Sequence, residues 1–219
     1  MRRLQIALII LAPALGGTAL AAAARIDGVS VQAVPPAVLT AEALAEDIQA
    51  DLDTSGWQAA RAKVVQLQAN RVALRVAASG SRFASYETAL DSLTAQVQRH
   101  DRPAALIAAN EMSRVLLTIT ADYAPTVPVQ VGYLDVGGRD AIYRAETGRW
   151  QDASAAVAEL RANYAVVRPH LADANPTLDR RLRRRLNELD GAVAAKGAAR
   201  VRTIATALLD DVDLVERAY

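Results

Sequence analysis

Apolar side chains recur at intervals of three and four residues along most of this chain, from about residue 40 to residue 217. That spacing is the period of one face of an α-helix, whereas a half-buried β-strand would alternate apolar and polar residues. Good helix formers, chiefly alanine, leucine, arginine, glutamate and glutamine, dominate the same region. The pattern therefore predicts an all-α protein.

Turn signals divide the helical region into antiparallel hairpins. Three hairpins are predicted, at about 40–78, 85–121 and 129–168. Thr40 is the expected N-cap of the first helix, because its hydroxyl can accept a hydrogen bond from the first turn. A long C-terminal helical segment is expected over 176–217. Together these elements predict one helical domain, 40–219, that packs either as a bundle or as a short α-solenoid.

One helix of this pattern occurs twice. The segment WQAARAKVVQLQANRVALR at 57–75 returns 93 positions later as WQDASAAVAELRANYAVVR, with nine of nineteen positions identical. Upstream of the two copies, Asp47 and Thr54 match Asp140 and Thr147 at the same offset. The repeated unit is therefore a helix, a tight turn and a second helix that begins with Trp57 or Trp150. A weaker third unit lies between the copies, at an offset of 43.

Residues 138–157, GRDAIYRAETGRWQDASAAV, resemble the turn of a tetratricopeptide hairpin. They carry the Gly…Tyr…Gly-x-aromatic-x-x-Ala succession of that turn. The spacings of 43 and 50 residues between units differ from the period of about 34 residues in that family, so the likeness is one of hairpin construction. This resemblance implies a concave surface that binds another protein.

The N-terminus has the pattern of a secretory signal peptide. Arg2 and Arg3 precede an apolar stretch that Pro13 interrupts, and small residues follow at 22–24. This order predicts a signal peptide over 1–24, an extended leader over 25–39 and a periplasmic location. No later apolar stretch is long enough to span a membrane, which takes about 20 residues.

Charge and cysteine content narrow the function classes. Without Arg2 and Arg3, the chain has one more acidic than basic residue, which argues against a nucleic-acid binder. The absence of cysteine excludes disulfides and thiolate metal sites. Five arginines concentrate within 179–190. They favour a solvated amphipathic helix, which the acidic tail at 210–216 could balance, or a surface for an acidic partner or the anionic membrane surface.

Five residues form the candidate ligand-binding site. Asn110 corresponds to core leucines of the other repeat units, and Glu111 and Arg114 share its helix face. Asp135 and Arg139 form a second i,i+4 pair, beside two glycines that would let a ligand approach. Both groups flank the break at 123–128, so a shared cleft is predicted there. The alternatives are a buried asparagine satisfied by a nearby loop, and an exposed ion pair.

Motifs for catalysis are missing from the sequence. It contains no Gly-rich phosphate loop, no Gly-x-Ser-x-Gly and no helical pair of metal-binding histidines. We therefore expect a non-enzymatic periplasmic binding or adaptor protein for a protein or small-molecule ligand, with no cofactor. The alternative is a helical-bundle carrier or sensor of metal or haem, for which the candidate ligands are His100, Met112 and His170.

Export should remove the signal peptide. We expect the mature N-terminus to lie between about Ala22 and Arg25, after the small-residue pattern that signal peptidase recognises. Intact-mass analysis of protein recovered from the periplasm measures this directly. Retention of residues 1–20 in that protein would contradict the prediction.

Overall fold

The computed structural model describes residues 25–26, 29–30, 32–78, 80–123, 125, 127–217 and 219. The predicted signal peptide, 1–24, lies outside the described residues. Strands β1 (Arg25–Ile26) and β2 (Val29–Ser30) pair antiparallel within a first unit, residues 1–31. Residues 32–219 form a second, compact unit whose described secondary structure is entirely helical, as the apolar periodicity predicts. The fold is therefore all-α.

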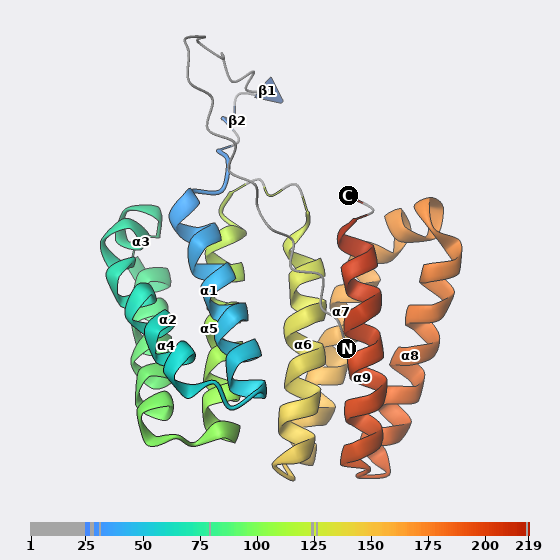
Figure 1. The fold of residues 1–219 in the computed structure, drawn as a ribbon. Coiled ribbons are helices and arrows are strands. Elements are labelled where there is room, and N and C mark those ends of the chain that lie inside the picture. The colour runs from blue at the N-terminus through green and yellow to red at the C-terminus, as the bar shows by residue number, and fades with distance from the viewer. Residues whose placement is uncertain are drawn as a thin grey trace. The chain divides into compact units, whose positions relative to one another are not determined.

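The helices of this second unit form two groups, an N-terminal bundle and a C-terminal bundle (Figure 1). The helices are α1 (Pro36–Asp53), α2 (Trp57–Ala69), α3 (Arg71–Ala77), α4 (Gly80–Arg99), α5 (Arg102–Thr120), α6 (Val129–Glu146), α7 (Trp150–Ala174), α8 (Pro176–Ala194) and α9 (Ala198–Glu216). In the N-terminal bundle, α1 and α4 each pack on both α2 and α5. In the C-terminal bundle, α6 and α8 each pack on both α7 and α9. Each set thus closes into a four-helix bundle, and α5 packs on α6 to join the two.

The C-terminal bundle is a second copy of the N-terminal one. Helices α6 and α7 begin 93 residues after α1 and α2, and α9 begins 96 residues after α5. The left-handed turn residues repeat at the same offsets, Ser55 with Gly148 and His100 with Lys196. The long C-terminal segment is therefore itself a hairpin, α8–α9, and the repeated unit is a whole bundle.

This duplication changes which helix of the chain is the repeat counterpart of α5. At the offset of 96, its buried positions coincide with those of α9: Ala105 with Val201, Ala109 with Ala205 and Met112 with Leu208. The weaker equivalence at an offset of 43 is replaced by this register. Asn110 then corresponds to the exposed Thr206, so the burial of Asn110 comes from the neighbouring bundle and not from its own.

Three helix ends differ from the sequence prediction. Helix α4 begins at Gly80, five residues before the predicted start of the second hairpin at about 85. Helix α1 begins at Pro36, and Thr40 lies one turn inside it without capping it. Proline is well suited to the first helical position, because it lacks the N–H that would be unsatisfied there. Helix α7 continues through Pro169 to Ala174, although proline removes one helical hydrogen bond. Its buried residues on both sides of Pro169, Val167 and Leu171, show that tertiary packing outweighs that loss.

The arginine-rich helix α8 is balanced within the chain. Asp211 of α9 is buried between Arg181 and Arg185, whose Nε atoms lie 2.7 and 2.6 Å from its carboxylate oxygens. Asp179, also buried, pairs with Arg168 of α7 at 3.3 Å. A buried carboxylate needs such partners because desolvation without them is costly. Two arginines of the basic run therefore fasten α8 to α9, and an aspartate of α8 pairs with α7.

Glycines allow α6 to pack closely in the C-terminal bundle. A Cβ atom at Gly137 would lie 2.8 Å from Cγ of Leu160, a fully buried side chain of α7. Gly191 of α8 is exposed, and a Cβ atom there would meet no atom outside its own helix backbone within 4 Å. The two positions therefore separate helix propensity from packing.

We expect Gly191→Ala to raise the free energy of unfolding by about 0.5–1 kcal/mol, the helix propensity of alanine over glycine. Gly137→Ala should lower it by about 1 kcal/mol or more, because the overpacking of Leu160 exceeds that gain. Urea unfolding of both variants followed by circular dichroism measures the difference. Equal stabilisation by the two substitutions would show that α6 and α7 are not packed this closely.

Candidate ligand-binding site

A cavity of about 480 Å³ lies at the junction of the two bundles. Helices α1 and α5 line it from the N-terminal bundle, and α6 and α9 line it from the C-terminal bundle. Aliphatic side chains form much of its wall: Val34, Leu39, Leu117, Val127, Val129 and Val136. A concave apolar site with a few polar groups is the usual form of a small-molecule pocket, and the volume lies within the usual range of about 300–1,000 Å³.

Equivalent faces of the duplicated bundles line this cavity. Glu42 and Glu46 of α1 correspond, 93 residues later, to Asp135 and Arg139 of α6. Leu39 corresponds to Gly132. A Cβ atom at Gly132 would lie 2.5 Å from Cδ2 of Leu117, so this glycine allows α5 and α6 to approach where the bundles meet. The duplication thus placed the same helix face on two sides of one cavity.

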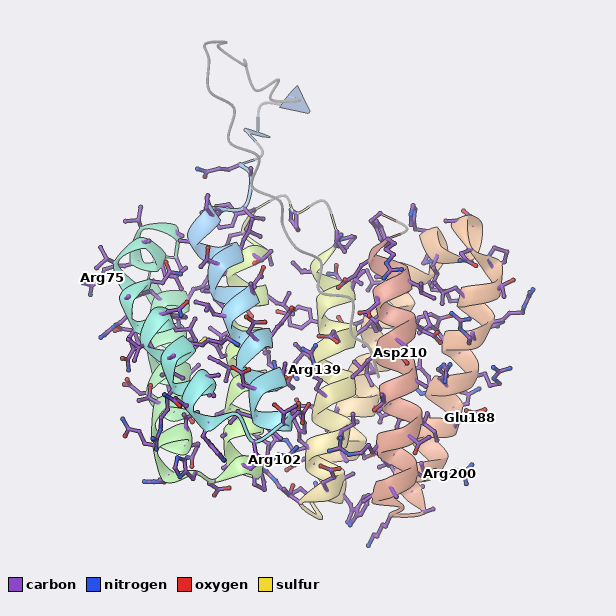
Figure 2. The ribbon with its side chains drawn as sticks, in the orientation of Figure 1. Arg75, Arg102, Arg139, Glu188, Arg200 and Asp210 are labelled. Atoms are coloured by element: carbon purple, nitrogen blue, oxygen red, sulfur yellow. The ribbon has the colours of Figure 1, made fainter. Side chains whose placement is uncertain are left out.

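Carboxylates outnumber cations in the cavity wall. Asp135 pairs with Arg139 across one helical turn, with Oδ2 and Nη1 2.5 Å apart. Figure 2 shows Arg139 between α1 and α6. The hydroxyl of Thr120 donates to Oε1 of Glu42 at 2.5 Å. Glu46 and Glu216 complete the set, so the cavity wall carries four carboxylates and one guanidinium.

This arrangement raises the pKa values of the three glutamates. Desolvation by the surrounding protein raises the pKa of Glu46 to about 7, and Asp135, Glu216 and Glu42 add to the rise while Arg139 opposes it. Desolvation also raises the pKa values of Glu42 and Glu216. The Glu46 side chain is exposed to water where it lines the cavity, although many protein atoms lie around it. The cavity therefore makes it unfavourable for all of its carboxylates to be ionised at the same time.

The other predicted site residues lie outside this cavity wall. Asn110 is fully buried, and its Nδ2 donates to the carbonyl oxygen of Val136, in the middle of α6, at 2.9 Å. Its partner is thus a helix and not the predicted loop. Its Oδ1 accepts no hydrogen bond from the described residues. Asn110 therefore belongs to the contact between the bundles.

Glu111 and Arg114 take part in an ion network of α5, α6 and α7. Arg114 contacts Asp140 at 2.7 Å and Glu111 at 3.5 Å, and it also pairs with Glu159. The five predicted residues therefore divide into a cavity pair, Asp135 and Arg139, a buried asparagine and a separate ion network.

Sequence reasoning missed Glu42, Glu46, Thr120 and Glu216. A signal for two of them was present, because Glu42 and Glu46 occupy the repeat positions of Asp135 and Arg139. Thr120 and Glu216 are equivalent only at the offset of 96, which becomes visible once α5 is matched to α9.

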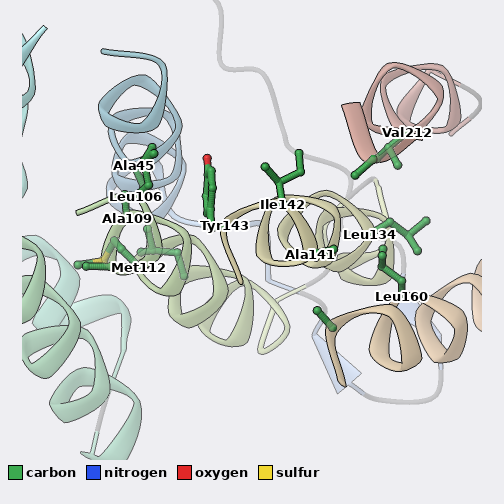
Figure 3. Close-up of a cluster of buried hydrophobic side chains, with 14 of the residues drawn as sticks. Ala45, Leu106, Ala109, Met112, Leu134, Ala141, Ile142, Tyr143, Leu160 and Val212 are labelled. Atoms are coloured by element: carbon green, nitrogen blue, oxygen red, sulfur yellow. The ribbon is translucent and has the colours of Figure 1, made fainter. Parts of the chain in front are cut away.

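A buried polar chain continues from the cavity into the junction. Nε2 of Gln49 donates to Oγ of Ser113 at 3.1 Å, and the hydroxyl of Tyr143 lies 3.5 Å from Oε1 of Gln49. Figure 3 shows Tyr143 between the buried residues of α1 and α5 and those of α6. The contact between the bundles therefore contains specific polar pairs in addition to apolar packing.

The three candidate haem ligands do not converge on one site. Met112 is fully buried in the core of the N-terminal bundle. His100 lies in the turn before α5, against Trp57 with ring centroids 4.8 Å apart, and His170 stacks on Tyr219 at 4.4 Å. Within the described ranges, no group of three His, Cys, Asp or Glu side chains is placed to hold a metal ion.

Comparison of the chain with protein-family models, curated proteins and solved structures gives no match. In the part of the chain that the structure describes, no helix combines the length and the apolar character needed to cross a lipid bilayer.

Two buried polar residues of the junction should respond oppositely to substitution. Asn110→Leu removes the hydrogen bond to Val136, but it also removes a buried acceptor that has no partner among the described residues and whose burial costs at least as much, so we expect stability to be kept or raised by about 1 kcal/mol. Ser113→Ala removes the acceptor of Gln49, so we expect a loss of about 1 kcal/mol. Chemical denaturation of both variants tests this, and strong destabilisation by Asn110→Leu would show that the hydrogen bond from Nδ2 to Val136 outweighs the burial of Oδ1.

Proposed function

We propose that this protein is a non-enzymatic periplasmic binding protein whose cavity takes a small ligand with an apolar body and a cationic group. The observation that carries the proposal is the cavity between the bundles, which combines aliphatic walls with four carboxylates and one arginine. The predicted signal peptide supports the periplasmic location.

Charge balance favours a cation over an anion. Asp135 already neutralises Arg139, which leaves Glu42, Glu46 and Glu216 without an arginine or lysine partner of comparable closeness in the cavity wall. Bringing carboxylates together in a site of reduced polarity raises their pKa values, because each charged form is poorly solvated and repels the others. A bound amine or guanidinium group would stabilise the charged forms, so binding and ionisation of Glu46 favour each other.

The aliphatic walls favour an apolar ligand body. Leu39 is about half exposed, at 51%, although it lies at the cavity. Covering such surface contributes about 25 cal/mol for each Å² removed from water. The apolar contact would supply affinity, and the carboxylates would orient the charged end of the ligand.

The test uses three probes that each have an unbranched chain of eight carbon atoms: octylammonium, octanol and octanoate. By isothermal titration calorimetry at pH 8, we expect affinity to fall in that order, because only octylammonium complements the carboxylates. Glu46→Gln should weaken octylammonium binding about tenfold and leave octanol binding unchanged. Glu111→Gln is the matched control, because Glu111 belongs to the separate Arg114 network and should not alter binding.

The pH dependence has a defined sign. Because the pKa of Glu46 is raised to about 7, Glu46 is largely ionised at pH 8 and largely protonated at pH 6. Octylammonium affinity should therefore fall as the pH is lowered through 7, and Glu46→Gln should flatten this dependence. Tight octanoate binding, or equal binding of all three probes, would contradict the proposed ligand class. Absence of binding for all three would contradict the cavity as the site.

A further inference from the structure

The helix pair α2–α3 has apolar residues on two opposite faces. Its inner face contributes Ala60, Val64, Leu67 and Leu74 to the core of the N-terminal bundle. The outward face carries a second row of apolar residues, which we call the outer stripe: Ala62, Val65, Ala69, Val72 and Val76. The three valines of this stripe are 61%, 79% and 87% exposed. On an ordinary protein surface exposed apolar residues are scattered singly, whereas here they form a continuous row.

The spacing of the outer stripe is that of a coiled-coil seam. Its members follow one another at intervals of three, four, three and four residues, the a and d positions of a heptad. Asn70, between α2 and α3, has right-handed helical backbone angles of −76° and −8°, so the register continues across the junction. The stripe is therefore presented along both helices.

The sister helix α7 supplies an internal comparison. At the offset of 93, the outer stripe corresponds to Ala155, Ala158, Ala162, Ala165 and Pro169, all exposed. The same fold therefore has alanine where the N-terminal bundle has Val65 and Val72. Since neither valine is needed to form the bundle, the enlarged apolar row calls for a role outside the chain's own core.

The flanks of the outer stripe indicate the charge of its partner. Residues 57–77 contain Arg61, Lys63, Arg71 and Arg75 and no acidic residue. Lys63 and Arg71 pair with carboxylates of α1 and α4. Arg61 and Arg75 occupy g positions beside the seam, and neither forms an ion pair with a described residue. Figure 2 shows Arg75 on the outer side of α3.

The same flank of α7 is arranged differently. There the equivalents of Gln68 and Arg75 are Arg161 and Arg168, which pair with Asp190 and Asp179 of α8. In the N-terminal bundle, Arg61 instead lies 2.6 Å from Nε2 of His100, and Arg75 lies over the ring of Phe83 at 5.2 Å. Two cations beside the outer stripe therefore have no acidic counterpart, whereas those of the sister helix do.

We propose that the outer stripe of α2–α3 docks an acidic amphipathic helix of a partner protein. Charges at the e and g positions decide partner choice in helix pairs, so Arg61 and Arg75 select glutamate or aspartate on the facing helix. A second copy of this chain fits poorly, because two α2–α3 surfaces would bring cations together with no acid on either. A lipid surface fits less well than a helix, because interfacial helices insert large side chains such as Trp, Phe and Leu, and the stripe has only alanine and valine.

The experiment titrates the full-length mature protein into a fluorescent synthetic helix with leucine at a and d and glutamate at e and g. Fluorescence anisotropy should show binding that Val65→Ala/Val72→Ala/Val76→Ala weakens about tenfold, since that variant restores the alanine-type surface of α7. Arg61→Glu/Arg75→Glu should weaken binding at least about tenfold. Val166→Ala on α7, at a valine also 61% exposed, is the matched control and should change nothing.

A second probe with lysine in place of glutamate makes the test independent of folding defects. It should bind the Arg61→Glu/Arg75→Glu variant and not the wild type, which a misfolded variant could not do. Equal binding of both probes to wild type would overturn the proposal. So would binding to vesicles containing phosphatidylglycerol without binding to the acidic helix, or self-association in sedimentation that the valine substitutions abolish.

Discussion

The packing of α5 on α6 is the interaction on which the candidate site depends. It joins two bundles that are otherwise closed, and it brings the equivalent faces of α1 and α6 to two sides of one cavity. Gly132 permits this close approach, because a Cβ atom there would lie 2.5 Å from Cδ2 of Leu117. Asn110 donates to Val136 and Tyr143 donates to Gln49 across the contact between the bundles, and these directional hydrogen bonds fix one arrangement of the bundles more strictly than apolar contact alone would.

Duplication explains both the likeness of the two bundles and the places where they differ. The turns keep their left-handed residues at Ser55 and Gly148, and at His100 and Lys196, because the backbone path is the same. Two of the differences that matter for binding fall on outward faces. On one such face Glu46 became the counterpart of Arg139, and on another the valines of α2–α3 became the counterparts of alanines in α7. Faces that a single bundle would leave in solvent are therefore the ones available for binding.

The cavity and the outer stripe are separate surfaces with opposite charge preferences. The cavity carries an excess of carboxylates and involves the junction of the bundles, whereas the outer stripe belongs to the N-terminal bundle alone and is flanked by arginines. A near-neutral chain can therefore present one site suited to a cation and another suited to an acidic helix. The net charge of the chain describes neither the cavity nor the outer stripe, because the charge of each surface depends on how the charged residues are distributed.

The sequence by itself determined the helical class, most helix limits and the existence of a repeat. These are local properties: the apolar period and the recurrence of the Trp57 helix can be read from neighbouring residues. The sequence also predicted that Asn110 is buried and that Asp135 and Arg139 form a pair. It could not show that the hairpins pair into four-helix bundles, because alanine-rich helices can pack on one another in several ways.

Only the tertiary structure decided which polar residues meet. Glu42, Glu46 and Glu216 come together because α1 and α9 approach the cavity from different bundles, about 170 residues apart in sequence, and no local period encodes that distance. For the same reason the structure separated Asn110 and Arg114 from Asp135 and Arg139, although all lie on two consecutive helices. The position of a residue in the sequence specified the helix face on which it lies. The packing of the two bundles specified what that face contacts.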